Sequence, residues 1–590
     1  MLAQPIGTCL CVLTSVSGGS QAALTDGGKS EYCIVIPAAA SEAERKAADE
    51  VQRFLWQVTG AELPIVTDDQ PAASHELVLG DSVRLRRAGV EIDWEKLGDD
   101  GFRILTRGDR LLIAGGGVRG TLNGVYTFLE DYLGCRWLSA TVSVIPRRET
   151  VVLRPIDVTQ VPALSFREVY YADAMDPDFA SRNKLNGNAS IMRDGVMIGE
   201  HHSGWDLWCH SFFTLVPRDR YFAQHPEYYG LVNGKREAKQ LCLTNPDVLR
   251  IAVEALKQRW AEHPDATYTS VSQNDWGGNC GCDACRAIDE REGTPMGSML
   301  EFVNNVAVQL PDKTISTLSY QYTRRPPRTL APADNVLIML CSIECNRSKP
   351  IASDPANASF RDDVRGWSRL SGNLFIWDYV IQFSNLLDPF PNLRVLQPNV
   401  RFFVSHGAKG MFAQGNREYA GEFGELRAYV LAKLLWNPDC DVNRVVDDFL
   451  QGYYGAGWRP IRRYIDLMHD ALGRSGAGLS IYGGPGDART TYLTSELVAR
   501  YDALFGEAER LAGADAEAVR RIRVARMPLM FAKLELGYGT VAERRSLLRR
   551  FCLLAREVGL QRLTEWGRTP EEFRADIQAR LDKESAESAQ

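Results

Sequence analysis

The sequence lacks the features that bind nucleic acid or cross a membrane. Its net charge is −7, and no run of lysine and arginine forms a basic patch, which argues against a nucleic-acid partner. No stretch approaches the ~20 consecutive apolar residues of a membrane-spanning helix. With 45% hydrophobic and 24% charged residues, the composition is that of an ordinary globular protein.

The N-terminus lacks the basic residues that begin a secretory signal peptide. No lysine or arginine precedes Lys29, although Pro5 to Val16 is mildly apolar and Ser-Gly-Gly-Ser-Gln-Ala22 resembles a cleavage region rich in small residues. Residues 1–28 are therefore interpreted as either an atypical signal or a disordered start. On the first interpretation we expect a secreted or periplasmic protein.

Cysteine is present in an odd number, 13, and is mostly scattered, which does not indicate a disulfide framework. Only Cys280, Cys282 and Cys285 form a triplet, in Cys-Gly-Cys-Asp-Ala-Cys. A zinc site needs four ligands, and a fourth would have to come from Cys209, Cys242, His210 or a carboxylate. A structural zinc, a loop disulfide and free thiols all stay open, and no other cofactor is expected.

The length predicts several domains, because 590 residues exceed what one core supports. Residues 30–155 alternate strand and helix patterns. Ser41 with Glu44 forms a capping box there, and apolar residues follow at helical spacing as far as Gly60. We assign residues 30–155 to a small α/β domain, 160–438 to a catalytic domain and 439–590, which show amphipathic helical patterns, to a helical C-terminal domain.

The region 160–438 repeats the order strand, loop, helix. About eight such alternations over ~270 residues predict a (β/α)8 (TIM) barrel. The candidate strands are Phe166 to Tyr171, Val196 to Gly199, Gln240 to Leu243, Tyr268 to Ser272, Ile315 to Tyr320, Val336 to Cys341, Leu374 to Trp377 and Gly410 to Ala413.

Polar residues follow most of these candidate strands, where a barrel places its catalytic groups. Hydrolysis of a glycosidic bond needs a proton donor and a second group for the oxocarbenium-like transition state, and Asp275, Glu344 and Asp378 are the candidates. For each, a strand-end ion pair or a helix cap is the competing interpretation. The candidate substrate-binding residues are Asn274, Trp276, His201, His202, Tyr320, Tyr322, Trp377 and Gln414.

Asn274 beside Asp275 suggests a more specific mechanism. If the sugar carries a 2-acetamido group, the carbonyl oxygen of that group can attack the anomeric carbon in place of a protein nucleophile. The protein then supplies an acid, for which we expect Asp275, and a neighbour that orients the amide, for which we expect Asn274.

Two regions resemble known families. The N-terminal region resembles the N-terminal domain of family 67 α-glucuronidases and family 20 hexosaminidases. The resemblance rests on the helix Ala-Ala-Asp-Glu-Val-Gln-Arg-Phe-Leu55 and on Val-Thr-Gly60, Gly-Val-Tyr126 and Gly-Cys-Arg-Trp137. The middle resembles domain-of-unknown-function family 4838, through Ser-Gln-Asn-Asp275, the cysteine triplet, Ile-Glu-Cys345 and Ile-Trp-Asp-Tyr379. That family overlaps glycoside hydrolase family 163, which includes endo-β-N-acetylglucosaminidases acting on complex N-glycans.

The resemblance implies a TIM-barrel glycoside hydrolase that cleaves β-linked N-acetylglucosamine in an oligosaccharide or glycoprotein glycan, with Asp275 as acid. Family 20 hexosaminidases have an Asp-Glu pair after the fourth strand, where this chain has Asn274 and Asp275. The sugar, the stereochemistry and endo or exo action therefore stay open. The alternatives are an inverting, α-glucuronidase-like exo-glycosidase and a catalytically inactive carbohydrate-binding protein. The oligomeric state is not defined by the sequence.

Overall fold

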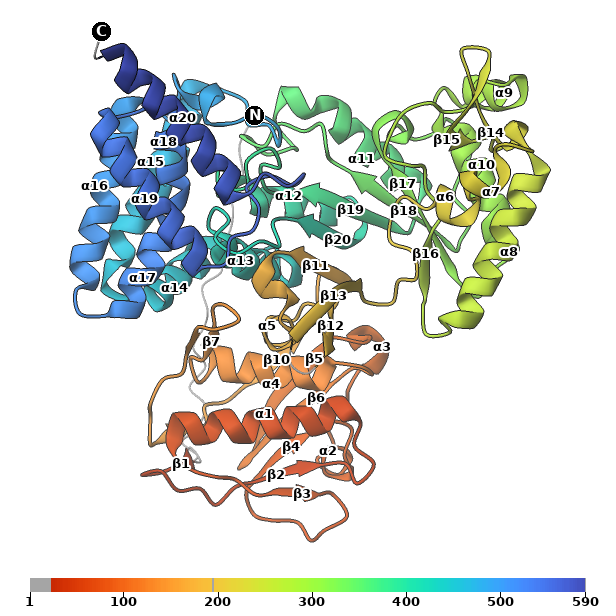
Figure 1. Ribbon diagram of the computed structural model, residues 1–590. Helices are drawn as coiled ribbons and strands as arrows, with labels where there is room; N and C mark the ends of the chain where they lie inside the picture. The colour runs from red at the N-terminus through yellow and green to blue at the C-terminus, as the bar shows by residue number, and fades with distance from the viewer. Residues whose placement is uncertain (1–22, 194–195, 589–590) are drawn as a thin grey trace, which may run out of the picture. The chain divides into compact units, whose positions relative to one another are not determined.

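The computed structural model describes residues 23–193 and 196–588, leaving out the side chains of residues 189–201 (Figure 1). Most of the signal-like segment 1–28 therefore lies outside the described residues. The chain forms two compact units, one up to Cys135 with Ile145–Val161 and the other of Arg136–Val144 with Pro162 onward. Among the described residues, no helix is both long enough and apolar enough to cross a membrane.

The first unit contains a six-stranded mixed sheet in the order β10-β5-β6-β4-β2-β3. Its strands are β2 (Cys33–Ile36), β3 (Ile65–Thr67), β4 (Glu76–Leu79), β5 (Phe102–Arg107), β6 (Arg110–Gly115) and β10 (Asp157–Gln160). Helices α1 (Glu42–Thr59) and α4 (Gly120–Asp131) pack against each other. The structure contains the predicted capping box of Ser41 and Glu44, and Gly60 ends α1 in the left-handed conformation at φ 82°.

The second unit is built on a curled parallel sheet. Six strands pair in the order β11-β20-β19-β18-β17-β16. They are β11 (Phe166–Tyr170), β16 (Tyr268–Ser270), β17 (Thr314–Ser319), β18 (Val336–Cys341), β19 (Leu374–Tyr379) and β20 (Ala408–Gln414). Every residue of β18 is buried, as expected for a strand covered on both faces.

The predicted barrel is confirmed only in part, because the described residues contain six regular strands of this sheet and not eight. The second candidate strand lies in β13 (Val196–His202), which pairs antiparallel with β12 (Asn188–Arg193). The third overlaps β15 (Lys235–Leu241), which pairs antiparallel with β14 (Tyr229–Val232). Both segments have a strand pattern, but that pattern belongs to hairpins outside the parallel sheet.

Segments outside the parallel sheet cover both of its edges. Along β16, Tyr268 N donates to Gly204 O at 2.9 Å and Ser270 N donates to Leu207 O at 2.9 Å. Along β11, Val169 N donates to the side-chain oxygen of Asn188 at 3.1 Å. Edge groups of the backbone are thus satisfied without two further regular strands.

Helices alternate with the strands of the curled sheet and then form a separate bundle. The alternating helices include α8 (Pro246–Glu262), α9 (Asp283–Glu292), α10 (Met296–Ala307), α11 (Ala358–Leu370), α12 (Leu393–Ser405) and α13 (Gly424–Trp436). The bundle, blue in Figure 1, consists of α14 (Val442–Tyr454), α15 (Trp458–Ser475), α16 (Ser495–Ala512), α17 (Ala516–Ala525), α18 (Met527–Leu536), α19 (Val541–Glu557) and α20 (Pro570–Ser588). The predicted helical C-terminal region is confirmed, and one continuous hydrophobic core joins it to the sheet.

Candidate active site

Asp275 is an exposed carboxylate at the carboxyl end of the curled sheet. The chain beyond β16 is buried from Val271 to Asn274 and emerges at Asp275, whose side chain is 57% exposed. Tyr320, directly after β17, donates its hydroxyl to Asp275 Oδ1 at 2.9 Å. His210 Nε2 lies 3.7 Å from the same oxygen, while its Nδ1 lies 2.6 Å from Gln273 O. Asp275 is therefore held in place and still open to solvent.

Tyr320 stays a hydrogen-bond donor to Asp275 over a wide pH range. Burial raises the pKa of its hydroxyl, and the negative charge of Asp275 raises it further. Gln321 Nε2 in turn donates to the Tyr320 hydroxyl oxygen at 2.9 Å. The three side chains form a chain of donors that ends on the carboxylate.

Glu565, in the loop between α19 and α20, is a second carboxyl group whose charge interacts with that of Asp275. Two backbone hydrogen bonds fix this loop: Leu386 N to Leu563 O at 2.8 Å, and Glu565 N to Phe383 O at 3.0 Å. Desolvation and then the charge of Asp275 raise the pKa of Glu565. A carboxyl group whose pKa is raised by burial and by a neighbouring charge is a candidate for acid–base catalysis.

An aromatic cavity of about 350 Å³ lies beside Glu565. Its lining includes Tyr170, His202, Trp208, Trp377, Phe412, Gln414, Arg417, Glu418, Arg562 and Glu565. The indole of Trp377 donates to Gln414 Oε1 at 2.6 Å. The ring of His202 stacks on Trp208 at 3.8 Å, with its Nδ1 2.5 Å from Glu168 Oε1. Aromatic faces with a few fixed polar groups suit a sugar ring.

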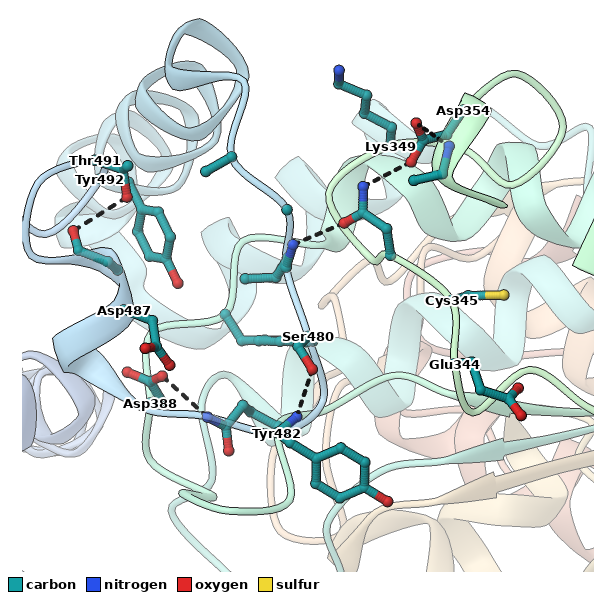
Figure 2. A pocket seen from close by; sticks show the side chains of 18 of the residues that line it. Glu344, Cys345, Lys349, Asp354, Asp388, Ser480, Tyr482, Asp487, Thr491 and Tyr492 are labelled. Atoms are coloured by element: carbon teal, nitrogen blue, oxygen red, sulfur yellow. Dashed lines mark hydrogen bonds between the residues drawn. The ribbon is translucent and has the colours of Figure 1, made fainter. Parts of the chain in front are cut away.

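A larger cavity of about 920 Å³ is lined by Glu344 and Tyr482, with Asp388, Asp487 and Tyr492 on the side away from Glu344 (Figure 2). Glu344 is 45% exposed and accepts a hydrogen bond from Arg324 Nη1 at 2.8 Å.

Tyr482 links the larger cavity to the Asp275 region. Burial raises the pKa of Tyr482, and the charges of Glu565, Asp275 and Glu344 add to the shift. All three carboxyl groups therefore lie near enough to the Tyr482 hydroxyl for their charges to act on it.

Asp378, the remaining candidate carboxylate, is enclosed by protein groups. The carboxylate is buried, accepts from Ser342 Oγ at 2.5 Å and Tyr379 N at 3.1 Å, and forms an ion pair with Arg347 Nη1 at 3.2 Å. Among the described residues, neither Asp378 nor Asp275 lines either cavity, so burial and the ion pair are what distinguish Asp378. The competing interpretation, a strand-end ion pair, describes its surroundings.

Two predicted substrate-binding residues have hydrogen-bond partners within the protein, and a third, Tyr322, is desolvated. The side-chain Nδ2 of Asn274 donates to Lys239 O at 2.8 Å, and the indole nitrogen of Trp276 donates to the same oxygen at 2.9 Å. Tyr322 is desolvated near Asp289, and both effects raise the pKa of its hydroxyl. Trp276 is 44% exposed, so its ring is still accessible. The side chain of His201 lies outside the described residues.

Sequence reasoning missed Glu565, Trp208 and Tyr482, and it named His210 only as a possible metal ligand. The sequence did contain a signal for Trp208 and His210. Both lie in Trp205-Asp-Leu-Trp-Cys-His210, an aromatic and polar stretch outside any candidate strand. Glu565 lies in a region with helical patterns on both sides, so nothing local links it to the sheet.

The cysteine triplet has a fourth member, Cys242, which follows β15. The sulfur atoms of Cys242, Cys280, Cys282 and Cys285 all lie within 4.8 Å of one another. Of the four possible sources of a fourth ligand, the structure brings Cys242 into the group, while His210 lies at Asp275.

Comparisons with known proteins agree with this architecture. The family model described as "Domain of unknown function (DUF4838)" matches residues 137–466, more than half of the chain, and confirms the predicted resemblance. A search of curated protein sequences found no match.

Two solved structures of glycoside hydrolases align with most of the chain. One is a family GH115 4-O-methyl-alpha-glucuronidase with specificity for decorated arabinogalactans, with a TM-score of 0.55 and 12% identity over 91% of this chain and 77% of that one. The other is a GH138 enzyme targeting pectin rhamnogalacturonan II, with a TM-score of 0.43 and 10% identity over 93% and 79%. The first likeness shows a shared fold.

Proposed function

We propose that this chain, which belongs to the DUF4838 family, is a glycoside hydrolase that cleaves β-linked N-acetylglucosamine in complex glycans. The observation that carries the proposal is Glu565, which lines the aromatic cavity and whose pKa is raised by burial and by the charge of Asp275. The fold shared with a glycoside hydrolase supports the reaction class, and the sequence resemblance supports the sugar.

In the proposed reaction the sugar ring occupies the aromatic cavity and its acetamido oxygen attacks the anomeric carbon. Glu565 gives its proton to the leaving oxygen as the glycosidic bond breaks. Water then adds to the oxazolinium intermediate and returns a proton to Glu565. This route needs no protein nucleophile.

Asp275 takes the orienting role in this scheme. Its carboxylate, held by Tyr320 and close to His210, accepts the acetamido N–H and balances the positive charge that develops on the ring. The sequence alone suggested Asp275 as acid and Asn274 as orienter. The assignment changes because the amide nitrogen of Asn274 already donates to Lys239 O and because the pKa of Glu565 is raised, which favours its protonated form.

A second candidate is a glycosidase acting on uronic-acid-bearing glycans. Arg417 and Arg562 both line the aromatic cavity, and guanidinium groups bind carboxylates well. Arg562 Nη2 already binds Glu418 Oε1 at 2.6 Å, so a uronate would compete with Glu418. The structural relative with the shared fold is a 4-O-methyl-alpha-glucuronidase.

A substrate panel separates the candidates. The purified chain is incubated with N-glycoproteins, aryl β-N-acetylglucosaminides and glucuronic-acid-decorated oligosaccharides, and released sugars are measured. We expect cleavage of the first two and competitive inhibition by a thiazoline analogue of the bicyclic intermediate. Release of uronic acid alone would support the second candidate. Glycan binding without turnover of any substrate would indicate a carbohydrate-binding protein.

The leaving group tests the role of Glu565. A leaving group that departs without protonation needs no acid, so Glu565→Gln should be slow on a natural glycan and close to wild type on an activated aryl glycoside. Asp275→Asn should be slow on both. If Glu565→Gln lost the same fraction of activity on both substrates, Glu565 would not be the acid.

A further inference from the structure

Four cysteines from two separate segments converge next to the loop that carries Asp275. Cys242 directly follows β15, Cys280 and Cys282 lie between β16 and α9, and Cys285 lies in the first turn of α9. Cys242, Cys280 and Cys285 are buried, and Cys282 is partly exposed. All four are free thiols.

The spacing of the sulfur atoms matches a tetrahedral metal site. The Sγ atoms of Cys242 and Cys282 are 3.7 Å apart, and all four Sγ atoms lie within 4.8 Å of one another. Four sulfurs at ~2.3 Å from a central zinc ion lie ~3.8 Å from one another in an ideal tetrahedron. A disulfide would require ~2.05 Å between two of them.

The surroundings of the cluster suit thiolates. Leu231 N lies 3.3 Å from Cys280 Sγ and Arg236 Nη1 lies 3.7 Å from the same atom, both as donors. Thr244 Oγ1 is 3.3 Å from Cys285 Sγ. Donors and a positive charge of this kind offset the negative charge of a tetrathiolate site and orient its ligands.

We propose that Cys242, Cys280, Cys282 and Cys285 bind one structural zinc ion. Four thiolates leave no open coordination position, so the ion holds the fold together and does not act on substrate. Tetrahedral sulfur ligands also suit iron, and the experiment below separates the two metals.

The zinc ion would fix the Asp275 loop to the β14–β15 hairpin. Gly281 N donates to Leu231 O at 2.8 Å, and Gln240 Nε2 donates to Asn274 O at 3.0 Å. The two segments lie so close that a Cβ at Gly230 would stand 2.8 Å from Gly278 O. Since Asn274 directly precedes Asp275, a metal that joins these segments also sets the position of the carboxylate.

The test is elemental analysis of the full chain, purified without chelators. We expect about one zinc per chain in the wild type and in the control Cys440→Ser, and less than about a tenth of that in Cys282→Ser. Cys440 and Cys282 are both partly exposed free cysteines, so the control matches the thiol loss without touching the cluster. If Cys282→Ser does not fold, cobalt loading of the wild type should give thiolate-to-cobalt charge-transfer and tetrahedral ligand-field bands.

Several outcomes would overturn the zinc site. They are metal-free wild type with disulfides among these cysteines on mass spectrometry, iron in place of zinc in the purified protein, or full zinc content in Cys282→Ser. None of these measurements depends on enzymatic activity, so the inference stands or fails separately from the proposed function.

Discussion

Asp275 and Asp378 both lie at carboxyl ends of strands of the same curled sheet, Asp378 within β19 and Asp275 beyond β16, yet their environments are opposite. The Asp275 side chain is 57% exposed, with a neutral tyrosine donor on Oδ1. The Asp378 side chain is 3% exposed and forms an ion pair with Arg347, itself 2% exposed. A strand-end position therefore does not define a catalytic carboxylate. A strand-end carboxylate can act on a substrate only if its partner groups leave it accessible.

The difference arises from how each strand presents its residues. On β19, Trp377 lines the aromatic cavity while its neighbour Asp378 bonds to Ser342 and Arg347. Successive side chains on a strand point to opposite faces. Asp275 lies five residues beyond the last regular residue of β16, so this alternation no longer fixes its direction.

Replacing Asp275 should have the largest effect on function and almost none on stability. We expect Asp275→Asn to lower kcat/KM by about 10²–10⁴-fold and to change the free energy of unfolding by less than about 0.5 kcal/mol, as at other exposed sites. Steady-state kinetics and urea denaturation check the two parts. Unchanged activity would remove Asp275 from the reacting centre.

Replacing Asp378 should reverse this pattern. Asp378→Ala leaves the buried Arg347 without its partner, which costs about 3–5 kcal/mol. Urea denaturation should show a lower midpoint, with Asp275→Ala as the matched control. A loss of less than about 1 kcal/mol would indicate that Arg347 finds another partner or water.

Asp173 offers a third kind of carboxylate environment, with a neighbouring carboxyl group. Burial, followed by the charge of Glu425, raises the pKa of Asp173 to about 7, and Ala140 N donates to its Oδ1 at 2.8 Å. The folded state therefore holds a proton that the unfolded state has released, and stability falls as pH rises from about 4 to about 7. Asp173→Asn should remove this loss and be more stable than wild type at pH 8 by on the order of 2–3 kcal/mol.

Urea denaturation of wild type and Asp173→Asn at several pH values from about 4 to about 8 tests this window. The two stability curves should converge at the acid end and separate toward the alkaline end. Parallel curves would show that Asp173 does not carry the pH dependence.

Glu344 should show the smallest effect. It is 45% exposed and bound to Arg324, which also binds Asp363 at 2.7 Å. Glu344→Gln should cost about 0.2–1 kcal/mol of stability, measured by urea denaturation, and should change kcat/KM much less than Asp275→Asn does. A loss of activity as large as that of Asp275→Asn would place Glu344 in the reacting centre.

The sequence predicted the strands with strong local patterns and the carboxylate that follows β16. It could not distinguish strands of the sheet from hairpin strands at 196–202 and 235–241, because pairing partners are not encoded in local periodicity. Glu565 lies almost 300 residues beyond Asp275, and only the folded chain brings the two together. The sequence likewise left Cys242 as one of several possible fourth ligands, because only the folded chain brings it next to Cys280, Cys282 and Cys285.

The central claim is that Asp275 and Glu565 share one reacting centre, with the proton on Glu565. The pH dependence of kcat/KM on a natural glycan tests it most directly. Wild type should lose activity with rising pH in a limb above the usual range of a glutamic acid, because the pKa of Glu565 is raised. Glu565→Gln should be slow and lack this limb. A variant that keeps both the limb and wild-type activity would contradict the claim.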